Sequence, residues 1–143
     1  MTLEQKELLL KDLCARLPYG VKVEHAKCAC EVLSIDAYNE ELTIWKCPGY
    51  YPDVKLEDAK PYLFPLSSMT EEQKYDFYSR FIENDCDFND FKEFYLDGGM
   101  WHKMITSLDD VDSIIDWFHK NHFDYRGLIP TGLANNAVGK NIY

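Results

Sequence analysis

Leucines recur at helical spacing over residues 2–17, where the other positions are mostly charged or polar. Such a stripe is typical of an amphipathic helix that packs one face against a core. Thr2 can cap this helix, and Pro18-Tyr19-Gly20 stops it. The expected buried face consists of Leu3, Leu8, Leu9, Leu10, Leu13 and Leu17.

The pattern changes from helical to alternating after Gly20. Apolar and polar residues alternate in four short segments, separated by turn-rich pieces such as DAYNEE and CPGYYPD. The segments cover residues 21–24, 33–35, 42–45 and 54–57. Short strands with short connections favour antiparallel pairing, so we expect a small SH3-like barrel or a curled sheet from Val21 to about Leu63.

Helical patterns return after a proline-containing linker that ends near residue 69. Thr70 can cap a helix over residues 71–83, because an acidic pair follows it in the first turn. A second helix is predicted over residues 84–94, where phenylalanines repeat every third position, and Gly98-Gly99 stops it. The phenylalanines are Phe88, Phe91 and Phe94.

A last helix is predicted to begin at a cap formed by Ser107 or Asp109. Its apolar stripe contains Val111, Ile114, Ile115, Phe118 and His122. Residues 130–143 are small and polar enough to form an extended or frayed tail. The chain is therefore predicted to be α+β: an N-terminal helix and small antiparallel sheet over residues 1–69, an acidic helical subdomain over 70–129, and a tail over 130–143.

The net charge of −10 is concentrated in the predicted helical half. Residues 70–124 hold 14 acidic and 5 basic side chains, a net charge of −9, whereas residues 1–69 carry −3 and residues 125–143 carry +2. A surface of this sign repels a nucleic-acid backbone and attracts a basic protein. We therefore expect a protein partner with a basic surface, and direct nucleic-acid binding is disfavoured.

The cellular location is predicted from what the chain lacks. No apolar run approaches the roughly 18 residues that a membrane-spanning helix needs, and the N-terminal MTLEQKELLLKDL is charged, unlike a signal peptide. The five cysteines follow no regular framework, so we expect reduced thiols that act as small hydrophobic residues. These features predict a cytoplasmic protein without a membrane partner.

Two clusters could hold a metal or perform acid–base chemistry. His25, Cys28, Cys30 and Cys47 are the residue types that bind zinc, but their spacing departs from the usual paired-cysteine knuckle, and alternation places Cys28 and Cys30 on one strand face with core residues. Asp112, Asp116, His119 and His122 fall on neighbouring rows of one helix. Because His122 shares the apolar stripe, packed histidines are the favoured interpretation, and we expect no cofactor and no catalytic residue.

The acidic and aromatic segment from Glu83 to Asp97 is the most distinctive candidate surface. One interpretation is a solvated helix face over a phenylalanine core. The other is a docking face for a basic partner, with carboxylates around an aromatic anchor. The residues expected to bind the partner are Asp85, Asp87, Asp90, Glu93 and Phe88.

The string HFDYRGLI, residues 122–129, is predicted to close the helical half rather than to carry chemistry. Asp124 can cap a short turn, and Gly127 can supply an unusual backbone angle before Pro130. Arg126 is expected to form an ion pair with an acidic helix, at Asp116 or a neighbour.

Three phrases, CARLPYGVKV, KPYLFPLSSMTEEQKYDF and HFDYRGLIPTGLA, resemble a family of uncharacterised proteins encoded in Bacteroidales genomes, often in prophage or other mobile regions. The resemblance covers most of the chain but not residues 84–108, and it carries no catalytic residues. It implies a small phage or mobile-element accessory protein that binds host machinery.

The expected function is therefore a non-enzymatic interaction module, an adaptor or inhibitor of a host protein. A small metal-dependent or acid–base enzyme centred on Asp116, His119 and His122 is one alternative. Nucleic-acid binding through the small barrel is the other.

Overall fold

The fold begins with an N-terminal helix. The structure is a computed structural model that describes residues 1–46, 48–100 and 110–143. Helix α1 spans Leu3–Arg16. The Thr2 hydroxyl accepts a hydrogen bond from the Gln5 backbone N–H, and the Gln5 side chain accepts one from the Thr2 N–H. This reciprocal capping box satisfies backbone donors that the first turn leaves free. The predicted helix and its cap are confirmed.

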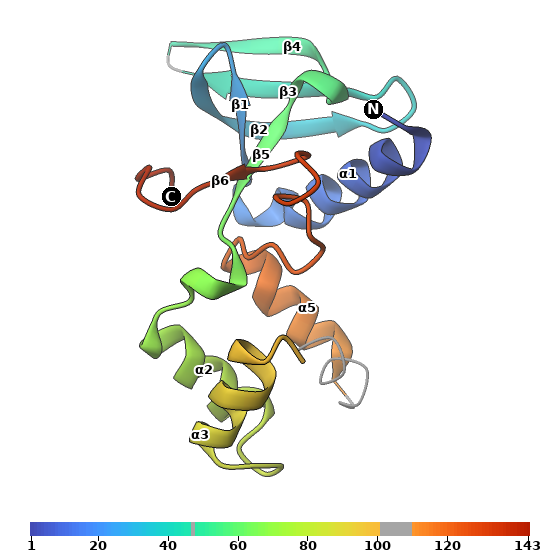
Figure 1. The fold of residues 1–143 in the computed structure, drawn as a ribbon. Helices are drawn as coiled ribbons and strands as arrows, with labels where there is room; N and C mark the ends of the chain where they lie inside the picture. The colour runs from blue at the N-terminus through green and yellow to red at the C-terminus, as the bar shows by residue number, and fades with distance from the viewer. Residues whose placement is uncertain (47, 101–109) are drawn as a thin grey trace.

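The alternating segments form a curled, open sheet (Figure 1). Its strand order is β4-β3-β2-β1-β5-β6, and β5 and β6 run parallel while the other neighbours are antiparallel. The strands are β1 (Lys22–His25), β2 (Cys28–Asp36), β3 (Glu41–Lys46), β4 (Gly49–Lys55), β5 (Lys60–Leu63) and β6 (Asn135–Asn136). Because β4 and β6 form two edges, the sheet is curled rather than closed into a barrel, and the predicted α+β class is confirmed.

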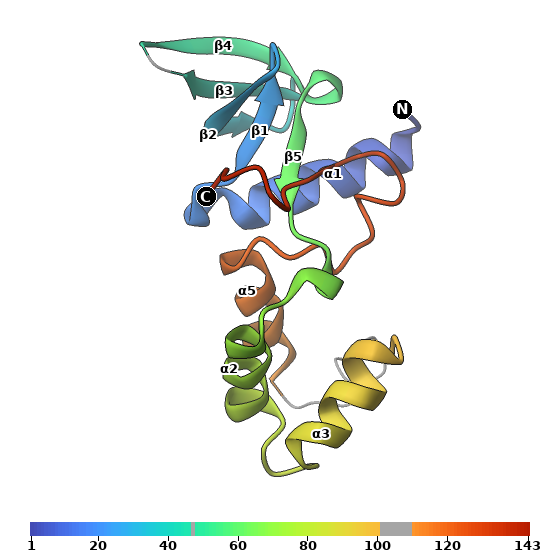
Figure 2. The same cartoon turned by 60° about the vertical axis from the view of Figure 1, so that its left-hand side comes forward.

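Helix α1 lies below the sheet and forms the first core with it (Figure 2). Leu9 and Leu13 are fully buried there against Val23, Val32 and Ile44. Strand β2 alternates between this core and solvent, as expected of a sheet with one covered face.

The helical half begins at Thr70, which caps α2 (Glu71–Phe81) as predicted, and Gln73 completes a second capping box. The next helix starts later than predicted, because Asp87 caps it through the backbone N–H groups of Asn89 and Asp90. It contains α3 (Phe88–Asp90) and continues as the π-helical segment η4 (Phe91–Asp97). Helix α5 spans Val111–Lys120. Short 3-10 turns occupy Leu17–Tyr19 (η1), Leu56–Asp58 (η2) and Leu66–Ser68 (η3).

The start of α5 is set by Asp110, whose carboxylate accepts a hydrogen bond from the Ser113 backbone N–H at 3.3 Å. The predicted caps Ser107 and Asp109 lie outside the described residues. Within the described helices, none has the length and apolar character needed to cross a membrane.

An aromatic core joins α2, η4 and α5. The ring of Phe77 lies 5.0 Å from Trp117 in an edge-on arrangement and stacks on Phe91 at 5.8 Å between centroids. Phe118 packs on the same ring at 5.5 Å. This core is separate from the aliphatic core under the sheet, so the two halves of the chain bury different kinds of side chain.

The C-terminal residues 130–143 pack against the sheet instead of fraying. Leu133, Ala134 and Ala137 are buried, and the Ala137 backbone N–H donates to the Leu63 carbonyl at 2.9 Å. The Tyr143 hydroxyl donates to the Tyr62 carbonyl at 2.8 Å. Small residues allow this close approach to β5. Of the two forms predicted for this tail, extended or frayed, fraying is therefore wrong, because the segment is a packed part of the fold.

Candidate functional site

Residues 83–97 form a turn followed by the helical stretch α3–η4, and we call them the acidic hairpin. This segment lies at the end of the molecule farthest from the sheet (Figures 1 and 2). Asp85, Asp87, Asp90 and Glu93 are all exposed, as the docking interpretation requires. Asp87 also has a local role, because one of its carboxylate oxygens caps the following turn. The structure thus places the four predicted carboxylates at exposed positions of one continuous segment.

Among the described residues, the two lysines in and next to this hairpin, Lys92 and Lys74, are already engaged. Lys92, the lone basic residue of the segment, contacts Glu71 at 3.3 Å and lies over the Phe88 ring at 4.6 Å. Lys74 contacts Glu71 at 3.1 Å. Hydrogen bonds from Lys74 and Lys92 hold the pKa of Glu71 below its ordinary value. The ammonium groups of Lys74 and Lys92 therefore bind Glu71 on α2, and they do not neutralise the exposed carboxylates of the hairpin.

Phe88 packs inward instead of projecting as an anchor. Its ring meets Tyr75 edge-on at 5.4 Å and Tyr78 at 5.2 Å, and it is half-buried. Phe94 is the aromatic that this hairpin exposes, with 57% of its surface accessible. The three-residue spacing suggested a common face, but the wider π-helical turn of η4 separates Phe94 from the buried Phe91.

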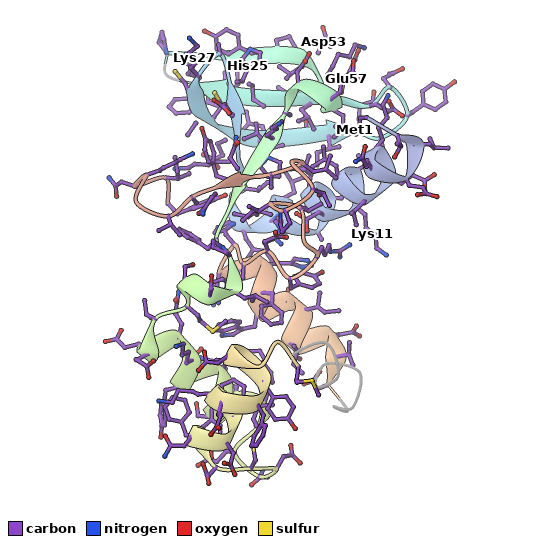
Figure 3. All side chains as sticks on the ribbon, in the orientation of Figure 1. Met1, Lys11, His25, Lys27, Asp53 and Glu57 are labelled. Carbon is purple, nitrogen blue, oxygen red and sulfur yellow. The ribbon has the colours of Figure 1, made fainter. Side chains whose placement is uncertain are left out.

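His25, Cys28 and Cys30, the described members of the candidate zinc set, do not form a group arranged to hold a metal. Cys30 faces the core under the sheet, and burial raises the pKa of its thiol, which disfavours the thiolate that zinc binds. His25, labelled in Figure 3, ends β1 at the β1–β2 turn. Its ring lies 6.1 Å from that of Tyr51 between centroids. Cys47 lies outside the described residues, and the described part of the chain contains no group of three or more His, Cys, Asp or Glu residues arranged to hold a metal.

The proposed acid–base cluster of α5 is dispersed in the structure. Asp116 accepts a hydrogen bond from the Tyr19 hydroxyl, and His119 Nε2 lies 2.9 Å from the Tyr125 hydroxyl. His122 follows the helix with a φ of 57° and stacks on Tyr143 with 3.7 Å between ring centroids. Asp112 is exposed elsewhere on the helix.

Both histidines are held neutral by their surroundings. Burial, reinforced by the charge of Arg16, lowers the pKa of His119 and of His122 to about 4. They are packed groups at the junction of the two halves, and they do not converge on a common hollow with Asp112 and Asp116.

A buried ion pair at this junction was not found from the sequence. Arg16 Nε donates to Asp12 Oδ2 at 2.7 Å, and Arg16 Nη2 donates to the Phe123 carbonyl at 2.8 Å. The available signal was an acid and a base four residues apart on the same helical face as Leu9 and Leu13. The pair connects α1 to the segment that follows α5.

The string HFDYRGLI closes this junction. Asp124 accepts hydrogen bonds from the backbone N–H groups of Leu128 and Ile129, both at 2.8 Å, and Gly127 has a φ of 75°. Arg126 Nε lies 3.4 Å from Asp12 Oδ1 and donates to the Tyr125 hydroxyl at 2.7 Å. Its acidic partner is therefore on α1, whereas the sequence suggested Asp116 or a neighbour.

The exposed face of the sheet carries two aromatic side chains. Trp45 and Tyr50 are cross-strand partners on β3 and β4, and Glu31 of β2 lies opposite Trp45 on its other side. A stacking platform for single-stranded nucleic acid combines aromatics with a basic groove. Lys22 of β1 lies opposite Glu31 in the same row, so the two charges offset each other and the row lacks the excess of positive charge that such a platform uses.

No known protein family matches the chain, and neither curated proteins nor solved structures yield a similar protein. The functional interpretation therefore depends on the geometry and charge of these residues.

Proposed function

We propose that this chain is a non-enzymatic protein-interaction module whose acidic hairpin binds a basic surface of another protein. The observation that carries the proposal is the exposure of Asp85, Asp87, Asp90 and Glu93 on one segment whose lone lysine is held by Glu71. Fields of one sign accelerate encounter with a complementary surface and orient it on arrival.

Phe94 supplies the apolar contact that charge alone does not provide. Interfaces gain most of their affinity from a few well-packed anchors, among which aromatic side chains are common. Phe94 is exposed within the same helical segment as Glu93 and Asp90, so a partner that meets the carboxylates can also cover its ring. Phe88 supports this surface from below, because it packs against α2.

The partner we propose is a host protein in the bacterial cytoplasm, bound by an adaptor or inhibitor of phage or mobile-element type. The resemblance to Bacteroidales phage-associated proteins supports this context. A host protein that normally binds nucleic acid would offer the basic surface that the hairpin requires.

A charge-neutralised variant tests the proposal in affinity capture from bacterial lysate. The variant carries Asp85→Asn, Asp87→Asn, Asp90→Asn and Glu93→Gln; asparagine at position 87 preserves the helix cap. A matched control carries Glu4→Gln, Glu7→Gln, Glu31→Gln and Asp53→Asn, all at exposed positions outside the hairpin.

We expect the wild type and the control to retain the same basic protein at low salt and the hairpin variant to lose it. Equal retention by the hairpin variant would contradict the proposal. Circular dichroism of the three proteins establishes that each is folded.

A further inference from the structure

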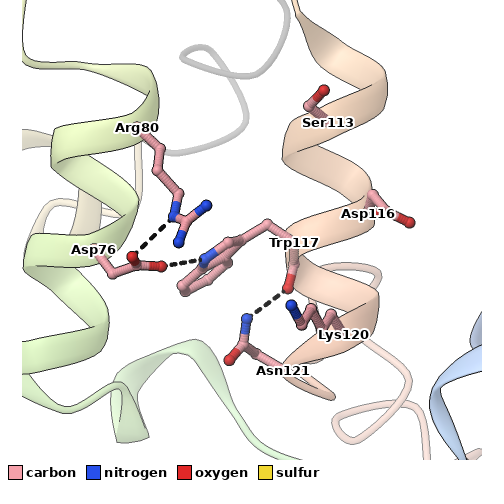
Figure 4. A pocket seen from close by; sticks show the side chains of 7 residues that line it. All are labelled: Asp76, Arg80, Ser113, Asp116, Trp117, Lys120 and Asn121. Atoms are coloured by element: carbon pink, nitrogen blue, oxygen red, sulfur yellow. Dashed lines mark hydrogen bonds and ion pairs between the residues drawn. The ribbon is translucent and has the colours of Figure 1, made fainter.

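A hollow of about 310 Å³ lies between α2 and α5 (Figure 4), and no residue of the acidic hairpin is among those that line it. Arg80 extends from α2 toward α5, and the Trp117 indole lies in the space between the helices. The lining residues are Asp76, Arg80, Ser113, Asp116, Trp117, Lys120 and Asn121.

Asp76 organises this hollow but uses both carboxylate oxygens to do so. Its Oδ2 accepts from Trp117 Nε1 at 2.8 Å, and its Oδ1 accepts from Arg80 Nε at 2.8 Å. These hydrogen bonds hold the pKa of Asp76 below its ordinary value, so the carboxylate stays ionised and fixes both donors. The second carboxylate, Asp116, points away from the hollow (Figure 4) and accepts a hydrogen bond from the Tyr19 hydroxyl.

Two cations, Arg80 and Lys120, and Ser113 supply hydrogen-bond donors of the hollow that Asp76 does not use. Among the described residues, neither the two Nη groups of Arg80 nor the Lys120 ammonium has a hydrogen-bond partner. The Arg80 guanidinium is bound through Nε, which leaves its terminal edge with two parallel N–H donors. The Ser113 hydroxyl lines the same hollow.

We propose that this hollow binds a small oxyanion, a carboxylate or a phosphate group. The terminal edge of Arg80 takes two oxygens of the anion in a bidentate arrangement, and Lys120 supplies the second positive charge from α5. Asp76 acts as the positioning residue, because it aims Arg80 without occupying the hollow. The site is distinct from the acidic hairpin, which attracts ligands of the opposite charge.

Titration with inorganic phosphate and, separately, with acetate tests the site by NMR. The Trp117 indole N–H resonance reports on the hollow, and the Trp45 indole on the sheet serves as an internal reference. The variants are Arg80→Gln, Lys120→Gln and, as a matched control, Lys11→Gln, which removes an exposed cation from α1 (Figure 3). Lys120→Gln leaves both hydrogen bonds of Asp76 intact.

We expect a saturable shift of the Trp117 resonance with one or both anions in the wild type and in Lys11→Gln. The anion whose titration saturates at the lower concentration is the one that the hollow prefers. Each pocket variant is expected to weaken binding about tenfold or more, because it removes a charge-assisted hydrogen bond. A linear, non-saturating response to both anions, an equal shift at Trp45, or unchanged binding by Lys120→Gln would overturn the proposal.

Discussion

Arg16 and Asp12 form an ion pair within α1 although both side chains are 0% exposed. Arg16 also donates to the Phe123 carbonyl, so one guanidinium joins the helix under the sheet to the segment after α5. A buried charge without its partner is costly, because the interior cannot solvate it as water does.

Asp12→Asn is therefore expected to destabilise the protein by about 3–5 kcal/mol, since it leaves Arg16 charged and buried without its counterion. Urea unfolding followed by circular dichroism measures the change. Glu41→Gln serves as the control, because it removes one partner of the surface ion pair with Lys55, which water can solvate, and is therefore expected to cost much less than Asp12→Asn. Similar losses in both variants would show that the buried pair has no special role.

Arg126→Ala is expected to destabilise the fold by about 1–3 kcal/mol while leaving partner capture intact. Arg126 contacts Asp12 and the Tyr125 hydroxyl at the junction and lies outside the acidic hairpin. Urea unfolding and lysate capture on the same sample separate the two effects. A stable variant that no longer captures the partner would instead place Arg126 in the binding surface.

Stability is expected to fall as the pH drops from about 6.5 toward 4. His119 and His122 have a pKa of about 4 in the folded protein, against an ordinary value of 6.5. Between these two pH values the histidines of the unfolded chain are protonated, whereas those of the folded chain stay neutral. The stability is fully present above pH 6.5, and each histidine removes on the order of 2 kcal/mol across this range.

His122→Asn tests the source of that loss, because asparagine tolerates the positive φ but does not titrate. We expect the difference in unfolding free energy between pH 7 and pH 5 to shrink by about half in this variant. An unchanged difference would assign the acid sensitivity to other groups.

Phe94→Ala is expected to weaken binding of the captured partner by about tenfold or more while changing stability by less than about 0.5 kcal/mol. Phe91→Ala is its structural counterpart: the ring is fully buried, and its loss is expected to cost about 3–5 kcal/mol. Titration calorimetry and urea unfolding of both variants make the comparison. Unimpaired binding by Phe94→Ala would exclude this ring as the anchor.

Local rules predicted the parts of the fold that local contacts determine. The caps at Thr2 and Thr70 were predicted because each threonine precedes acidic residues in a first helical turn, and the structure adds Gln5 and Gln73 as their reciprocal partners. Alternation located the sheet, but not the parallel strand β6, because pairing between residues 62 and 135 leaves no periodic trace in so short a segment.

The candidate site was only partly visible in the sequence. The exposed carboxylates of the hairpin follow from composition, whereas the choice between Phe88 and Phe94 depends on a π-helical turn that a regular period of 3.6 residues does not describe. Arg80 and Lys120 line one hollow only because α2 and α5 pack together in the tertiary structure, so no spacing along the sequence predicts it.

The association rate with the purified partner, measured against salt concentration, tests the acidic hairpin most directly. We expect the wild-type rate to fall steeply between about 0.05 and 0.5 M salt, because screening weakens the field of the four carboxylates. The Asp85→Asn, Asp87→Asn, Asp90→Asn, Glu93→Gln variant is expected to associate about tenfold more slowly at low salt and to depend little on salt. A variant with the rate and salt dependence of the wild type would contradict the account.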